Sequence, residues 1–367
     1  FVLSAGHGSM LLYSLLYLTG YPEMTLEQLQ NFRQVGSRTA GHPEYGHAPG
    51  IETTTGPLGQ GIANAVGMAI AEGHLSARFG SELVDHKTYV IASDGDLEEG
   101  ISHEAISLAG HLKLKKLIVL WDHNNITIDG ATSLSDNTDT IERFKAAGWT
   151  TDSCNGHDAA DVFRALGAAQ NSDAPVMIAC RTIIGFGMPN RQGTQKAHSD
   201  APGAEEVAAT RKELGWDFPP FVVPDDLFNQ WRAIGAQGKP AWENWVRRKN
   251  AHAKAKEFDA TLADAIPAEV GQGRGARKQK MSEEKPVAGT RKHSEKALEV
   301  INGAMPLTIG GSADLTPSNN TKTKNITEMG PGDFAGRYIH YGIREHGMAA
   351  AMNGMALHGG VIPYGGT

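Results

Sequence analysis

The sequence predicts an α/β protein with two parallel-sheet domains, and three observations support this fold class. Short apolar runs alternate with segments of helical pattern over the first half of the chain, which is typical of a parallel sheet covered by helices. Glycine is abundant, at 44 of 367 residues, which fits many tight strand-to-helix turns. A second alternation of helix and strand begins near Thr290, after a stretch of different composition.

The elements of the first domain can be placed in order. A helix rich in small residues is expected from about Leu58 to Phe79, and an apolar strand from Tyr89 ends in Asp94-Gly95. A helix from about Ile101 to Leu114 and a second apolar strand, LIVLW, follow. These alternating patterns predict adjacent parallel strands joined by a helical crossover.

The chain then turns at NGHD, from Asn155, into a helix (DAADVFRALGAAQ) and a further strand (VMIACRT). The next segment, IIGFGMPNRQGTQKAHSDAPG from Ile183, has no helical or strand period and is interrupted by Gly and Pro. Loops of this length inside a compact domain are uncommon without a function, so we expect a binding role for it.

The composition changes from about Trp242 to Pro286, where Ala, Lys and Arg dominate and indicate helices and a solvated linker. We therefore expect a first domain at residues 1–250, a linker at 251–288 and the start of a second domain at 289–367. The second domain should contain a helix (RKHSEKALEVI), strands at LTIGG and RYIHYG, and a helix from Glu345. Because residue 1 is Phe and an apolar run reaches the last residues, we expect a fragment that lacks both ends.

The bulk composition excludes some classes of function. A formal net charge of -7 gives no indication of nucleic-acid or membrane binding, and the longest apolar run, MLLYSLLYL, is too short to cross a bilayer. The two cysteines, Cys154 and Cys180, favour a reducing compartment, hence a cytoplasmic location. An organellar location stays open, because a transit peptide could have preceded Phe1.

Thirty positions separate Asp94 from Asn124, which is the length of one strand–helix–strand unit. Because a parallel crossover brings both strand ends to one edge of the sheet, these two residues should lie close together. Open α/β sheets bind ligands at that edge. A carboxylate, an amide oxygen and a nearby backbone carbonyl suit Mg²⁺ or Ca²⁺. The spacing therefore predicts a divalent-cation site.

The segment TTTGPLGQG, from Thr53, precedes the first long helix. Its glycines, Gly56, Gly59 and Gly61, allow backbone N–H groups to approach a ligand, and the start of the helix favours an anion. Taken alone, the segment is also typical of a tightly packed turn. Together with a neighbouring cation, it predicts a diphosphate site.

These motifs resemble those of thiamine-diphosphate enzymes, in which a GDG-like triplet is followed by Asn-Asn about thirty residues later. Five further segments resemble transketolases in particular: SAGHGSM, GHPE, TTTGPLGQG, GGSADLTPSN and YIHYGIREHGM. The resemblance covers nearly the whole chain, except the linker and the stretch around Phe218 to Lys249. It implies two thiamine-diphosphate-binding parallel-sheet domains, the first nearly complete and the second truncated.

The resemblance also implies roles for individual residues. The expected metal ligands are the side chains of Asp94 and Asn124 and the carbonyl of Ile126. The expected cofactor contacts are His7, Gly56, Pro57, Leu58, Gly95, Asn124, Ile128, Ile184, His198, Asp314 and Glu345. Sugar-phosphate contacts are expected at His42, His198, Arg291 and Ser318, and catalytic roles at Glu345, His198, His42 and His7.

The implied activity is the transfer of a two-carbon ketol unit from a ketose phosphate to an aldose phosphate, through a thiamine-diphosphate carbanion. The family implies a homodimer with active sites at the subunit interface, Mg²⁺ or Ca²⁺ as the metal, and a place in the pentose phosphate pathway. Glu345 would be a buried carboxyl that desolvation biases toward its protonated form. Histidines suit proton transfer near neutral pH, and Arg291 offers a planar fork for phosphate.

Two other interpretations share these motifs. One is a ketol transferase similar to dihydroxyacetone synthase, and the other is a non-catalytic fragment that only binds the cofactor. The sequence also departs from the family pattern at two positions. Ser93 is the first residue of the GDG-like triplet, and Ser199 follows His198 where the family usually has Gly, so this loop could take a shifted path.

Overall fold

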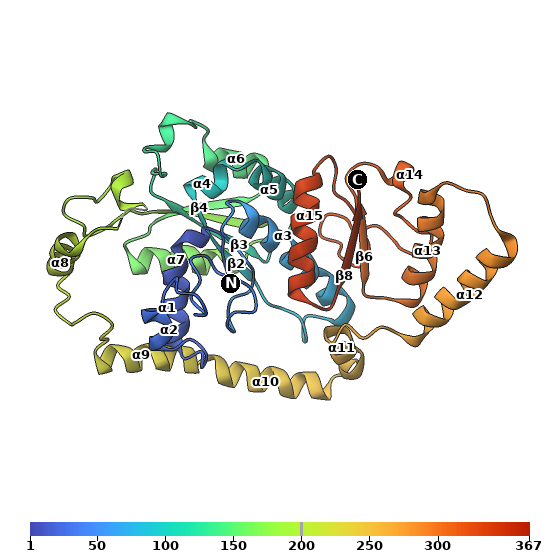
Figure 1. Cartoon of the computed structure of the whole chain (residues 1–367), viewed down its shortest axis with the longest axis horizontal. Helices are drawn as coiled ribbons and strands as arrows, with labels where there is room; N and C mark the ends of the chain where they lie inside the picture. The colour runs from blue at the N-terminus through green and yellow to red at the C-terminus, as the bar shows by residue number, and fades with distance from the viewer. Residues whose placement is uncertain (199–200) are drawn as a thin grey trace. The chain divides into compact units, whose positions relative to one another are not determined.

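The computed structural model describes residues 1–198 and 201–367, and the chain divides into two compact units (Figure 1). The first unit comprises Phe1–Ile62, Thr88–Ile106 and Lys115–Glu243, and the second comprises Ala63–Lys87, Ser107–Leu114 and Asn244–Thr367. Each unit contains a parallel sheet, so the predicted α/β fold class is confirmed. The domain boundaries at 250 and 289 stay a prediction.

The first unit contains a five-stranded parallel sheet in the order β1-β2-β3-β5-β4. Its strands are β1 (Val2–Leu3), β2 (Thr88–Ser93), β3 (Leu117–His123), β4 (Thr150–Asn155) and β5 (Val176–Arg181). The register pairs Ser93 with Asp122, which brings the carboxyl ends of β2 and β3 together. The apolar patterns predict β2, β3 and β5, whereas β4 reads TTDSCN and lacks an apolar pattern because it lies at the edge of the sheet.

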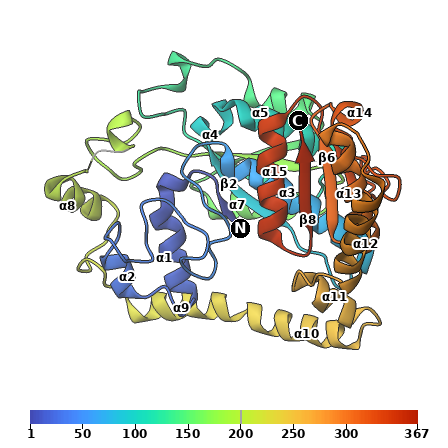
Figure 2. The same ribbon diagram turned by 45° about the vertical axis from the view of Figure 1, so that its right-hand side comes forward.

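Helices cover the sheet of the first unit, and two that are distant in sequence lie side by side (Figure 2). Tyr17 on α1 (Ser9–Thr19) contacts Phe228 on α9 (Asp225–Ala236), with ring centroids 5.6 Å apart. The guanidinium of Arg232 lies 4.6 Å from the centroid of the Phe228 ring. The other helices of the unit are α2 (Leu26–Gln30), α4 (Asp94–Glu98), α6 (Thr140–Ala146), α7 (Ala159–Ala169) and α8 (Ala204–Glu213), with short 3-10 turns at Gly6–Gly8, Thr132–Leu134 and Gln195–Ala197. Three helices, α3 (Gln60–Phe79), α5 (Gly100–Leu112) and α10 (Gly238–Ala251), contribute residues to both units.

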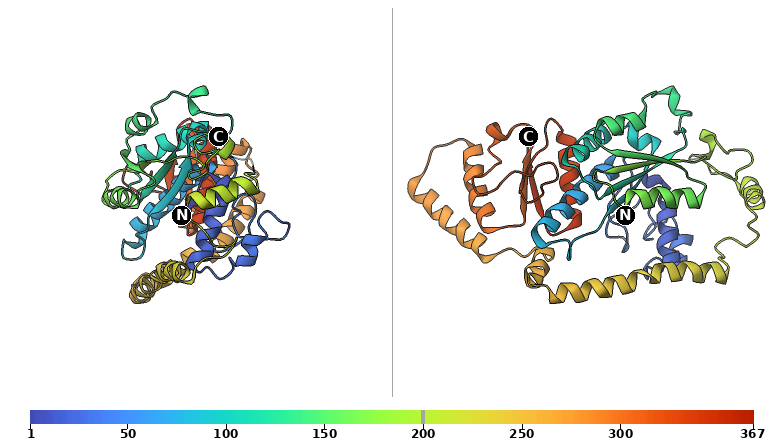
Figure 3. Two further views of the ribbon diagram at one scale, coloured as in Figure 1. Left: turned by 90° about the vertical axis from the view of Figure 1, so that its left-hand side faces the viewer. Right: turned by 180° about the vertical axis from the view of Figure 1, so that it is seen from behind.

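The second unit contains a three-stranded parallel sheet in the order β7-β6-β8. Two helices, α13 (Thr290–Ala304) and α15 (Glu345–His358), lie on opposite sides of this sheet (Figures 1 and 3). Much of the expected linker is helical. The remaining elements are α11 (Ala255–Leu262), α12 (Ala268–Glu284), β6 (Thr308–Ser312), α14 (Thr316–Asn319), β7 (Tyr338–His340) and β8 (Ile362–Gly366). No helix within the described part of the chain is both long and apolar enough to cross a membrane.

Two helices of the second unit, α3 and α15, approach so closely that only glycine fits at their contact. A Cβ atom on Gly67 would lie 1.9 Å from the carbonyl oxygen of Ala351, and a Cβ atom on Gly354 would lie 1.8 Å from that of Asn64. Real Cβ atoms do not approach oxygen atoms at such distances. The two glycines therefore set the distance between α3 and α15, whose first residue is Glu345.

Candidate active site

Asp94 is the first residue of the helix α4 and directly follows Ser93, the last residue of the strand β2. The hydroxyl of Ser93 accepts a hydrogen bond from the backbone N–H of Asp96 at 3.2 Å, and the carboxylate of Asp96 accepts one from the backbone N–H of Ser93 at 2.9 Å. This reciprocal pair is a capping box, which satisfies backbone donors at the start of α4. It fixes Asp94 at the carboxyl edge of the sheet.

The carboxylate of Asp94 is buried and accepts three hydrogen bonds. Its donors are Trp121 Nε1 at 3.0 Å and the backbone N–H groups of Asn124 and Asn125 at 3.2 and 2.9 Å. Asp94 and Asn124 therefore meet at the sheet edge, as their spacing predicts. Burial raises the pKa of Asp94 to about 6, and the hydrogen bonds offset part of that effect. A cation beside this carboxylate would stabilise its charged form.

The backbone after β3 curves around Asp94. Asn125 has a left-handed conformation with φ at 62°, and the side-chain oxygen of Asn124 accepts a hydrogen bond from the N–H of Ile126 at 3.0 Å. The atoms that could bind a metal ion here are oxygens, which suit Mg²⁺ or Ca²⁺. Among the described residues, no group of three or more His, Cys, Asp or Glu side chains could hold a metal ion.

Asp96, which the sequence reasoning missed, fixes the glycine loop. This fully buried carboxylate accepts hydrogen bonds from the N–H of Gly59 at 2.8 Å and from the hydroxyl of Ser4 at 2.9 Å. Gly59 has φ at 77°, a conformation that favours glycine, and a Cβ atom there would lie 2.6 Å from Ile101. The Ser-x-x-Asp spacing from Ser93 was the available signal, because it is typical of a helix start.

A cavity of about 770 Å³ opens beside these elements in the first unit. Of the predicted site residues, the cavity is lined by His7, Gly56, Leu58, Gly95, Ile126, Ile128 and His198. Met10, Phe32 and Arg33, which the sequence reasoning did not select, also line it. The predicted residues of this unit that are not among its lining residues are His42, Pro57, Asp94, Asn124 and Ile184, and Ser199 lies outside the described residues.

Two histidines stack at the cavity wall. The rings of His7 and His198 have centroids 5.0 Å apart. Desolvation lowers the pKa of both residues, and the neighbouring His198 lowers that of His7 further. The Nδ1 atom of His198 is buried and has no hydrogen-bond partner among the described residues. His42 is exposed and adjoins Gly56, where a Cβ atom would lie 3.2 Å from its ring.

The other predicted residues belong to the second unit. Glu345 is the first residue of α15, and its expected burial is wrong for the single chain, in which it is exposed at a helix start. Arg291 near the start of α13 and Ser318 on α14 are also exposed. Asp314 is exposed as well and has a left-handed backbone with φ at 59°.

Comparison with known families covers nearly the whole chain. Residues 1–269 match the family model described as the transketolase thiamine diphosphate binding domain, and residues 287–367 match the transketolase pyrimidine binding domain. The chain belongs to the transketolase family. The Asp94–Asn124 pair, the glycine loop and the stacked histidines all lie within the residues that match the thiamine diphosphate binding domain.

Individual transketolases show the same relationship. Those of Cereibacter sphaeroides and Sinorhizobium medicae are each 56% identical over 100% of this chain, which covers 56% and 53% of their own lengths. The solved transketolase of Leishmania mexicana is 42% identical, with a TM-score of 0.90 over 100% of this chain and 56% of that one. A Pichia stipitis transketolase in complex with sedoheptulose 7-phosphate is 39% identical, with a TM-score of 0.91, and this chain again covers 56% of it. The chain thus spans about half the length of the transketolases it matches.

The first unit fits the diphosphate and metal end of thiamine diphosphate. The oxygen donors around Asp94 suit the divalent cation, and the glycine loop at the start of α3 leaves room where side chains would otherwise project. The Nδ1 of His198, which has no hydrogen-bond partner among the described residues, offers a polar contact to a bound molecule.

Proposed function

We propose that this transketolase chain transfers a two-carbon ketol unit from a ketose phosphate to an aldose phosphate, with thiamine diphosphate and Mg²⁺ or Ca²⁺. The observation that carries the proposal is the hydrogen-bonded Asp94–Asn124 pair beside the glycine loop and the cavity. The relative solved with sedoheptulose 7-phosphate supports sugar phosphates as the substrate class.

Different residues of the first unit would bind the cation and the diphosphate. The side chains of Asp94 and Asn124 and the carbonyl of Ile126 would hold the cation, and the backbone from Gly56 to Gly59 would receive the diphosphate. When bound, the thiazolium ring supplies the nucleophilic carbon and the electron sink. Met10, Phe32 and the exposed Ile128 give the cavity an apolar wall that would exclude water from this ring.

His7 and His198 suit the proton transfers of this chemistry. Because desolvation lowers the pKa of both, the neutral ring dominates at pH 7, and each ring has one N–H donor and one lone pair. A neutral histidine can accept a proton from a sugar hydroxyl and return it later. The 5.0 Å stack holds both rings at one wall, so they can act on neighbouring hydroxyl groups of one substrate.

Product analysis tests the activity. With thiamine diphosphate, Mg²⁺ and xylulose 5-phosphate, we expect the protein to use ribose 5-phosphate as the acceptor in preference to formaldehyde. A preference for formaldehyde would instead support the dihydroxyacetone synthase-like function. Cofactor binding without any product would support the non-catalytic fragment.

We propose further that the protein is a homodimer with active sites at the subunit interface. Glu345 is exposed in the single chain, and a partner subunit would bury it. An Asp94→Ala chain mixed with a Glu345→Gln chain after unfolding and refolding should then recover about a quarter of the parental activity, because half of the random dimers carry one intact site of two. Each variant alone should be inactive. No recovery, with heterodimers confirmed by mass, would contradict a shared site.

A reducing compartment, the cytoplasm, is the proposed location. Cys154 on β4 and Cys180 on β5 are free, although their Sγ atoms are only 3.6 Å apart. Burial raises the pKa of both thiols, to about 12 for Cys180, and a neutral thiol is a poor nucleophile for disulfide exchange.

A further inference from the structure

The loop that carries His198 is attached to the NGHD turn by one side chain. The Nε2 atom of His157 accepts a hydrogen bond from the backbone N–H of Ile183 at 2.9 Å. The His157 ring also stacks on Phe186, with centroids 4.3 Å apart and an interplanar angle of 28°. A backbone N–H can only donate, so Nε2 must present its lone pair and the ring must be neutral with its proton on Nδ1.

The turn that holds His157 is hydrogen-bonded both within itself and to a strand of the sheet. The side-chain oxygen of Asn155 accepts a hydrogen bond from the N–H of His157 at 3.0 Å, and its carbonyl accepts one from the N–H of Asp158 at 3.0 Å. The N–H of Gly156 donates to the carbonyl of Arg181 on β5 at 2.8 Å. The turn is therefore fixed both internally and to the neighbouring strand.

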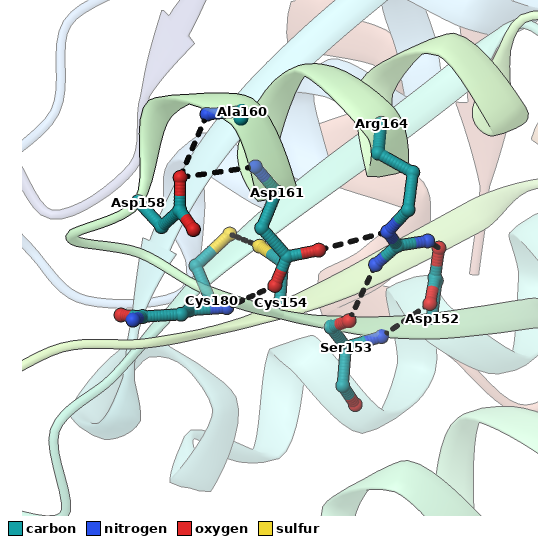
Figure 4. Close-up of polar contacts among 9 residues, drawn as sticks. Asp152, Ser153, Cys154, Asp158, Ala160, Asp161, Arg164 and Cys180 are labelled. Carbon is teal, nitrogen blue, oxygen red and sulfur yellow. Dashed lines mark hydrogen bonds and ion pairs between the residues drawn. The ribbon is translucent and has the colours of Figure 1, made fainter.

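A network around the start of α7 supports the turn from the other side (Figure 4). Asp158 caps the helix by accepting from the N–H of Ala160 at 2.9 Å, and Asp161 accepts from the N–H of Asn155 at 2.8 Å. Arg164 joins Asp161 to Asp152 through N–O contacts of 2.8 and 2.9 Å. His157 thus lies on a turn that hydrogen bonds and ion pairs hold in place, whereas Ile183 is the first residue of the loop.

Contacts within the loop link Ile183 to His198. The N–H of Gly193 donates to the carbonyl of Ile184 at 2.9 Å. At Gly185 the backbone packs so closely on Ala197 that a Cβ atom would lie 2.6 Å from the Ala197 Cβ. Ala197 directly precedes His198, whose ring lines the cavity and stacks on His7. A displacement of Ile183 would therefore reach His198 through Gly185 and Ala197.

We propose that His157 is a positioning residue for the cofactor cavity, because its neutral imidazole holds the loop from Ile183 to His198 in place. The inference rests on the proposed function, since it assigns the effect of the loop to thiamine diphosphate binding. It assigns no contact between His157 and the cofactor or the substrate. The hydrogen bond to Ile183 and the stack on Phe186 are separate contributions, and two substitutions distinguish them.

The test compares His157→Phe with His157→Gln in the full chain. Phenylalanine keeps a ring that can stack on Phe186 but accepts no hydrogen bond, whereas the glutamine amide oxygen can replace Nε2 as the acceptor. The readouts are amide hydrogen exchange over residues 183–198 and the Kd for thiamine diphosphate at saturating Mg²⁺. His111→Phe, at an exposed position on α5, is the matched control.

We expect His157→Phe to accelerate exchange of the Ile183 amide and to weaken cofactor binding about 5-fold, the typical effect of one hydrogen bond. His157→Gln should restore both values most of the way, and His111→Phe should match the parent. Unchanged exchange in His157→Phe, or equal losses in the Phe and Gln variants, would overturn the proposal. If the parent binds no thiamine diphosphate, the proposed function fails, while the exchange measurements still test the role of His157.

Discussion

Replacing Asp94 with alanine should remove the thermal stabilisation that thiamine diphosphate and Mg²⁺ give to the parent chain. A ligand at 100 times its Kd adds about 2.7 kcal/mol to the stability of the folded state, so the parent should show a clear rise in Tm. Asp94 is the charged member of the predicted metal shell and also holds the backbone of Asn124 and Asn125 in place. Its loss therefore removes both the charge and the geometry of the site.

Two further variants make this result specific. Asp94→Asn fills the same space without the charge, and its one oxygen can accept either from Trp121 or from the N–H groups of Asn124 and Asn125, so we expect a folded protein that has lost the metal-dependent rise in Tm. Asp173→Ala changes an exposed aspartate of the same unit and should keep the full rise. An unchanged rise in Asp94→Ala would show that the metal binds elsewhere.

Replacing Gly67 with alanine should destabilise the second unit by about 3 kcal/mol, at the upper end of typical overpacking effects. The added methyl group would lie 1.9 Å from the carbonyl oxygen of Ala351, and this oxygen belongs to a helix backbone that cannot rotate away. The two helices α3 and α15 would have to separate. Alanine has the better helix propensity by up to about 1 kcal/mol, which offsets only part of this cost.

Urea unfolding followed by circular dichroism measures the effect, and a second glycine serves as the control. Gly275, in the interior of α12, has no atom within 4 Å of the position that an added methyl group would take, so Gly275→Ala should leave stability unchanged or raise it slightly. Gly354→Ala should behave like Gly67→Ala, since its methyl group would lie 1.8 Å from the carbonyl oxygen of Asn64. Equal stability of the Gly67 and Gly275 variants would show that α3 and α15 are not in tight contact.

The sequence predicts the parts of this fold that depend on local patterns and on chain topology. The strands β2, β3 and β5 are apolar because they are buried in the middle of a parallel sheet, so their composition reveals them. The meeting of Asp94 with Asn124 follows from the handed crossover between two adjacent strands. Neither inference requires knowledge of distant contacts.

The features that the sequence reasoning missed depend on contacts between residues far apart in the chain, or on whether a residue lies at the edge of a sheet or at the surface. The strand β1 has two residues and is defined by its pairing with β2, and Ser4 reaches Asp96 across 92 positions of the chain. The polar strand β4 gives no apolar signal because it is at an edge. Burial of Glu345 was expected from the family, whereas the chain leaves this residue exposed at the start of α15.

The polar edge strand β4 also protects the folded protein from uncontrolled association. An exposed strand edge offers unpaired N–H and C=O groups, to which a strand from another molecule can add. Here the edge strand carries Asp152, whose carboxylate pairs with Arg164, and the guanidinium of Arg164 also donates to the carbonyl of Ser153. A strand that paired with this edge would have to remove the charged groups of Asp152 and Arg164 from water, which costs free energy. The five-stranded sheet therefore resists the pairing of strands from other molecules at β4, the longer of its two edge strands.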